Sequence, residues 1–63
     1  MLRDDLLVEE IDGQFVVVKR KMWEQEHPTA MRSIVGSAML AAGPYQTRTE
    51  ADRALASLSR QAG

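Results

Sequence analysis

The pattern of apolar and polar positions is clearest over residues 6–21, where it predicts a β-hairpin. Two runs of β-prone residues, 6–11 and 14–21, flank the pair Asp12-Gly13. An Asp-Gly pair between such runs favours a two-residue type I′ turn, because both central residues of that turn need a positive φ. Counting outward from the turn then fixes the register, from Ile11 opposite Gln14 to Leu6 opposite Lys19.

Both faces of the predicted hairpin are apolar at the centre. Four apolar side chains share each face: Leu6, Val8, Phe15 and Val17 lie on one, and Leu7, Ile11, Val16 and Val18 lie on the other. A sheet with one solvent-exposed face usually alternates apolar and polar residues. Either a second copy or another protein covers the second face, or the valines simply reflect the β-propensity of a core strand.

The second run ends in the basic tripeptide Lys19-Arg20-Lys21, followed by Met22 and Trp23. A basic strand beside an aromatic ring can contact phosphates and stack on a base. The register also places Asp5 opposite Arg20 and Asp4 opposite Lys21, which favours ordinary cross-strand ion pairs. Trp23 is the only tryptophan, and in so small a domain we expect it at or near the core.

Residues 24–42 are harder to assign. Pro28 ends any strand and biases His27 away from helix, so we expect His27 in a solvated loop. Residues 29–42 fit a helix begun by Thr29 and ended by Gly43. They also fit a strand over 34–42, or a short helical turn over 28–33 followed by that strand. The good helix formers Ala, Met and Leu favour the first interpretation locally.

The last segment predicts a helix with a defined start. Thr47-Arg48-Thr49-Glu50 is a capping box, in which Thr47 caps the helix and Glu50 reaches back to it. Small and apolar residues then recur at helical spacing, at Ala51, Ala54, Leu55 and Leu58. The charged residues of the same segment, Glu50, Asp52, Arg53 and Arg60, should point outward.

Residues 41–55, which contain Gly43-Pro44-Tyr45 and Thr47-Arg48-Thr49-Glu50-Ala51, resemble the strand-to-helix junction of several small α+β families. Among these are the sporulation-related peptidoglycan-binding repeats and the arm-type DNA-binding domains of integrases. The resemblance implies a third strand that ends near Ala42. We therefore predict one small α+β domain over residues 1–63, with a β-hairpin, a third antiparallel strand and a C-terminal helix on one face. The alternative is a hairpin followed by two helices.

Composition limits the chemistry that this chain can carry. It has 63 residues, a net charge of −1, one His and no Cys. These counts exclude disulfides and thiolate metal sites, and a lone His27 supplies no zinc cluster. The lack of Cys fits a cytoplasmic protein, and no apolar run is long enough to cross a membrane. No Gly-rich phosphate loop or nucleophile–base pairing is visible, so we predict no catalytic, cofactor-binding or metal site.

We therefore expect a non-enzymatic protein-binding module, regulatory or accessory, that acts through its sheet surface or an open strand edge and forms a homodimer. Small phage and plasmid proteins that inhibit host complexes, such as anti-CRISPR proteins, have a comparable size. The alternative is a nucleic-acid-binding module that uses the basic second strand. The candidate partner-binding residues are Val16, Val18, Lys19, Arg20, Lys21, Trp23 and Arg32.

Overall fold

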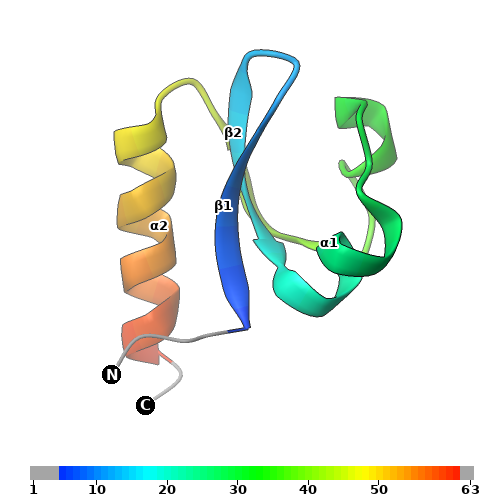
Figure 1. Cartoon of the computed structure of the whole chain (residues 1–63). Helices are drawn as coiled ribbons and strands as arrows, with labels where there is room; N and C mark the ends of the chain where they lie inside the picture. Colours follow the sequence, from blue (N-terminus) through cyan, green and yellow to red (C-terminus); the bar gives the residue numbers. More distant parts are fainter. Residues whose placement is uncertain (1–4, 62–63) are drawn as a thin grey trace.

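The computed structural model describes residues 5–61 and shows an α+β fold (Figure 1). Strands β1 (Leu6–Ile11), β2 (Gln14–Lys19) and β3 (Leu40–Tyr45) form an antiparallel sheet with β2 in the centre. Helix α2 (Arg48–Gln61) packs on one face. The short helix α1 (Arg20–Glu26) and the 3-10 helix η1 (Met31–Ser33) lie on the other side. The predicted fold class is confirmed, whereas the version with a hairpin and two further helices is wrong.

The hairpin follows the predicted register along its whole length. Ile11 pairs with Gln14, Leu6 pairs with Lys19, and the four pairs between them also match. Asp12 and Gly13 have φ values of 53° and 78°, as a type I′ turn requires. The Asp-Gly pair therefore sets the register, and the register decides which side chains share each face.

The strand β2 ends two residues earlier than predicted. The chain turns into α1 at Arg20, so Arg20 and Lys21 are helical and not extended. Residues 20–26 contain good helix formers, and the helical turn lets Met22 and Trp23 pack against the sheet. The helix ends at His27, whose left-handed conformation (φ 45°) comes directly before Pro28.

The third strand is also displaced from its predicted place. It spans Leu40–Tyr45, so it begins later than Ile34 and includes Gly43 and Pro44. Residues 34–38 form turns, because Ser37 Oγ donates to the Ile34 carbonyl over 2.7 Å and accepts from the Met39 N–H over 3.3 Å. The mixed interpretation, a short helical turn followed by a strand, is the nearest of the three to this arrangement.

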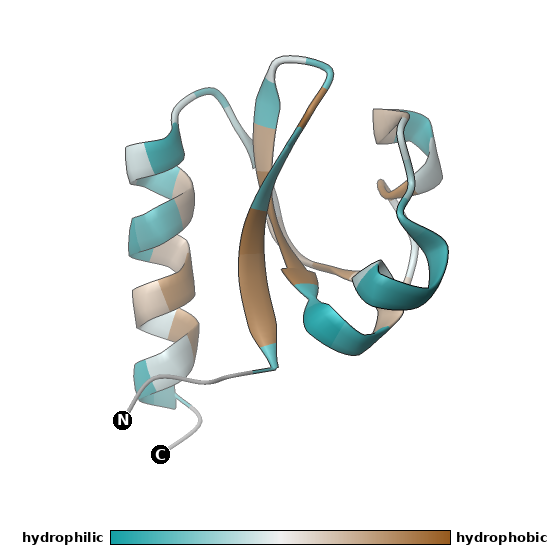
Figure 2. Cartoon of the chain, in the orientation of Figure 1, coloured by the Kyte–Doolittle hydropathy of each residue, from teal (hydrophilic) through white to brown (hydrophobic). Residues whose placement is uncertain are grey.

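An apolar cluster lies on each face of the sheet, and one chain supplies both. Figure 2 shows the most apolar stretches of the backbone on the strands, between α2 and the segment on the other side. On the α2 side, Leu6 and Val17 pack against the buried Ala51, with Ala54, Leu55 and Leu58 around them. On the other side, residues 20–39, here called the cover segment, bring Ile34 and Met39 onto the sheet. The second apolar face is therefore covered within the chain itself.

Candidate functional site

The described part of the chain, residues 5–61, contains no pocket and no group of three or more His, Cys, Asp or Glu residues placed to hold a metal ion. Every buried side-chain nitrogen or oxygen in the same range has a hydrogen-bond partner. No helix in this range is long and apolar enough to cross a membrane.

Two of the candidate partner-binding residues are part of the core. Val16 and Val18 are each 0% exposed and pack with Ile11, Ile34 and Met39. The prediction that they lie on an exposed face is wrong, because the cover segment lies on top of them. A charged side chain at either position would meet the core of this chain and no partner.

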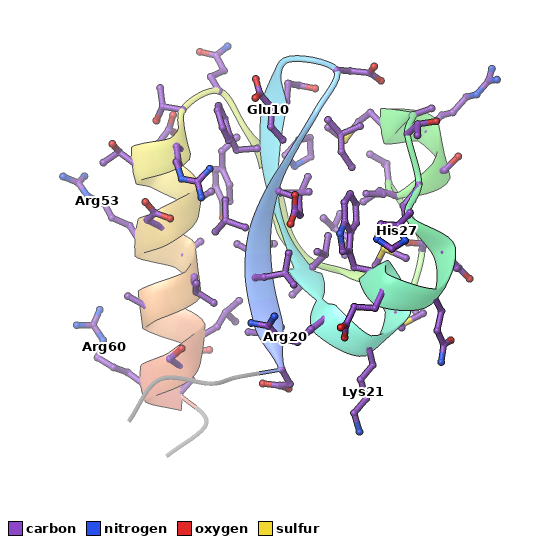
Figure 3. All side chains as sticks on the ribbon, viewed as in Figure 1. Glu10, Arg20, Lys21, His27, Arg53 and Arg60 are labelled. Atoms are coloured by element: carbon purple, nitrogen blue, oxygen red, sulfur yellow. The ribbon has the colours of Figure 1, made fainter. Side chains whose placement is uncertain are left out.

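The basic candidates do not form one patch. Lys19, Arg20 and Lys21 are exposed at the end of β2, where the chain enters α1. Arg32 lies in η1, which is tied to the hairpin turn at the start of β2 because the Met31 N–H donates to Asp12. The two groups are therefore separated by about the length of a six-residue strand, roughly 17 Å. Figure 3 shows Lys21 pointing away from the sheet.

Trp23 is half-buried and packs against the core on the cover-segment side. Its ring lies 5.8 Å from that of His27, measured between centroids, at an interplanar angle of 58°. This confirms the expectation that Trp23 lies at the core, and His27 is an exposed loop residue, as predicted. The contact of the two rings is local and lies at the C-terminal end of α1, within the cover segment.

The outer edge of β3 is poorly suited to strand pairing. Its register with β2 shifts twice, between Phe15 and Val17 and between Val17 and Val18. Pro44 lies within the strand and has no N–H to donate. Irregular pairing and proline are devices by which sheets protect their edges.

The outer edge of β1 has neither irregularity. Strand β1 pairs with β2 without a register shift and contains no proline. In a two-residue hairpin the residues next to the turn form a hydrogen-bonded pair, so Leu7, Glu9 and Ile11 bond to β2. The backbone bond from the Arg20 N–H to the Asp5 carbonyl (2.8 Å) continues this inner row.

The alternate residues of β1 present their backbone groups outward. These are Leu6, Val8 and Glu10, and their outward N–H and C=O groups are here called the β1 edge. Figure 1 views the sheet from this side, and no element of the described chain is drawn across β1. Leu7 and Val8 in the middle of the strand are only half-buried.

The candidate list from the sequence contains no residue of β1. The signal was nevertheless present, since the hairpin register alone defines which β1 residues point their backbone groups outward. The sequence does not reveal which strands lie at the edges of the sheet, because β3 could pair with either strand of the hairpin. The pairing of β3 with β2 leaves β1 as an edge.

Comparison with known proteins found no relative of this chain. No family model matches the sequence, and neither the curated proteins nor the solved structures include a significant match.

Proposed function

We propose that this chain is a protein-binding module that adds a strand of its partner to the β1 edge. The observation that supports this most directly is the contrast between the two edges of the sheet. The β1 edge is regular along six residues, whereas Pro44 and two register shifts interrupt the β3 edge. An edge strand without such protection is a template for pairing with another chain.

When a strand is added to a sheet edge, backbone hydrogen bonds provide affinity and side-chain contacts provide specificity. The N–H and C=O groups of Leu6, Val8 and Glu10 would form hydrogen bonds with the backbone of the partner strand. These bonds would contribute affinity whatever the amino-acid sequence of that strand. Specificity would come from the half-buried side chains of Leu7 and Val8, which would pack against neighbours on the partner strand. Glu9 and Glu10 favour a partner whose added strand is apolar at its centre and which carries a positive charge close to the hairpin-turn end of β1.

Of the two surfaces expected from the sequence, the open strand edge is available to a partner and the apolar sheet faces are not. Both faces are covered by the chain itself, so neither offers an apolar surface to a partner. A module that works this way acts by joining the sheet of its partner, which suits a regulatory or accessory role. The nucleic-acid alternative is less well supported, because Arg20 and Lys21 are helical and do not extend the basic strand, and Arg32 lies near the other end of β2.

A selection of extended peptides tests the proposal. Random heptapeptides displayed on phage are selected on the immobilised wild-type chain and counter-selected on Val8→Pro. Proline at Val8 removes an N–H that points away from β2, so no hydrogen bond between β1 and β2 is lost. The hairpin should therefore persist, and a thermal melt of the variant checks this. We expect peptides rich in β-branched residues that bind the wild type and lose binding to the variant.

Two further variants make the result independent of the Val8 side chain. Glu10→Pro removes another outward N–H at an exposed position, and it should also abolish peptide binding. Glu9→Pro is the matched control, because the Glu9 N–H bonds to β2, and we expect it to disrupt the hairpin. Peptides that bind the wild type and both outward-row variants equally would overturn the proposal.

A further inference from the structure

We propose that the β1 edge binds a second copy of this chain, so that two antiparallel β1 strands join two three-stranded sheets into one. The inference rests on the proposed function, because it uses the same edge and names its occupant. The two-fold axis passes at Val8. Three observations support this arrangement: the register that β1 allows, the charges of β1, and the position of Arg20 beside one end of β1.

The hydrogen-bonding rows limit the registers that are possible. The outward residues of one copy, Leu6, Val8 and Glu10, must face outward residues of the other. The register centred on Val8 is the one that aligns residues 5–11 over their whole length. Leu6 then lies opposite Glu10 of the second copy, and Val8 lies opposite Val8.

In the same register no carboxylate of one strand lies directly opposite a carboxylate of the other. Asp5 lies opposite Ile11 of the second copy, and Glu9 lies opposite Leu7. Moving the axis by one residue towards Leu7 places Asp5 opposite Glu9, and moving it towards Glu9 places two Glu9 residues face to face. Like charges directly opposite each other destabilise a strand pair, so the charges favour the Val8 register.

Charges of opposite sign lie beside the two ends of β1, with Glu10 at one end and Lys19 and Arg20, together with the one carboxylate of Asp5, at the other. Figure 3 shows Glu10 at the hairpin-turn end of β1 and Arg20 at the other end, where its backbone N–H donates to the Asp5 carbonyl. Antiparallel alignment brings Glu10 of each copy to the Arg20 end of the other. The edge is therefore complementary to itself in charge, at two symmetric places.

Pairing of the two β1 strands is compatible with the layers of the fold and leaves both cores closed. Val8 points to the α2 face in each copy, and paired residues of antiparallel strands share a face. Both α2 helices therefore lie on one side of the joined sheet and both cover segments on the other. Leu7 and Val8, half-buried in the single chain, gain apolar neighbours at the junction.

A mixing experiment tests both the occupant and the register. Sedimentation equilibrium is measured on the wild type, Val8→Lys, Val8→Glu and an equimolar mixture of the two variants. We expect the wild type to rise from 7.0 kDa towards twice that mass with concentration. Each variant alone places like charges on the axis, and its dissociation constant should rise by about tenfold or more. The mixture pairs Lys with Glu and should recover the dimer.

A second pair of variants protects the test against poor folding at Val8. Glu10→Lys and Arg20→Glu change exposed residues, and here too the mixture should dimerise better than either variant alone. Circular dichroism shows whether each variant is folded.

A wild type that stays at 7.0 kDa at every concentration would overturn self-pairing, and the peptide selection would then decide the proposed function separately. Dimerisation that is equal in the wild type and in every folded variant would overturn the β1–β1 interface itself.

Discussion

The carboxylate of Asp12 accepts a hydrogen bond from the backbone N–H of Met31, with 2.9 Å between Oδ2 and the nitrogen. Asp12 is the first central residue of the hairpin turn, and Met31 begins η1 in the cover segment. One aspartate therefore both adopts the positive φ that the turn requires and attaches the cover segment to the hairpin. The two roles can be separated by substitution.

Asp12→Gly should keep the turn and lose the attachment. Glycine adopts a positive φ readily but offers no acceptor to Met31, so we expect the free energy of unfolding to fall by about 1 kcal/mol. Urea unfolding followed by the fluorescence of Trp23 measures this loss. Asp12→Asn is the control, because it retains both the acceptor and the tolerance for positive φ. Equal stability of the glycine and asparagine variants would contradict the role of the hydrogen bond.

Val18→Ala should destabilise the fold, because Val18 is completely buried under the cover segment. Removing its two methyl groups leaves a cavity, and we expect a loss of about 2 kcal/mol in the free energy of unfolding. Val35→Ala is the matched control, since Val35 is 53% exposed and its truncation should change stability by less than about 0.5 kcal/mol. Similar losses at the two positions in urea unfolding would contradict the burial of the second face by the chain itself.

Gly43→Ala should destabilise the protein more than Gly36→Ala. Both glycines have a positive φ, 104° and 83°, which alanine adopts only with strain. A Cβ at Gly43 would also lie 3.1 Å from the carbonyl oxygen of Phe15, whereas a Cβ at Gly36 would meet nothing within 4 Å. We expect about 1 kcal/mol for Gly36→Ala and a larger loss for Gly43→Ala, as compared by thermal melts. The reverse order would show that β3 approaches β2 less closely than described.

Thr47→Ala should weaken the start of α2. The Thr47 hydroxyl accepts the Glu50 N–H over 3.2 Å and donates to the Glu50 carboxylate over 3.1 Å. Losing this cap should lower the free energy of unfolding by about 1 kcal/mol. Thr47→Ser retains the hydroxyl and should remain close to the wild type. Chemical denaturation of the three proteins provides the comparison, and an unaffected alanine variant would mean that the cap contributes nothing.

The sequence predicted the hairpin and the C-terminal helix because both rest on local chemistry. Asp12-Gly13 defines its own turn, and Thr47 caps α2 as predicted, with Glu50 reaching back to the Thr47 hydroxyl. The charged residues of α2, Glu50, Asp52, Arg53 and Arg60, are exposed as predicted. Asp5 lies beside Arg20 as the register requires, while Asp4 falls outside the described residues.

The middle of the chain was less predictable because its structure depends on distant contacts. Ile34 and Met39 reach a fully buried place only when the cover segment folds back over Val16 and Val18. In the sequence these two residues fit both a helix and a strand, and the structure places them in neither, since residues 34–39 form turns. For the same reason Val16 and Val18 were wrongly predicted as partner-binding residues: the cover segment, and not a partner, packs on their face of the sheet.

The cover segment, residues 20–39, stands in the chain between β2 and β3, and this position has a consequence for the order of folding. The hairpin forms by closing a two-residue turn. Pairing of β3 with β2 instead closes a loop that contains the whole cover segment, and this closure costs more conformational entropy. Contacts distant in sequence form slowly, so β3 should acquire protection in pulse-labelled hydrogen exchange after the hairpin does. Until the cover segment folds back, Val16 and Val18 should stay exposed on one face of the hairpin, so an incompletely folded chain should present the apolar surface that the finished protein hides.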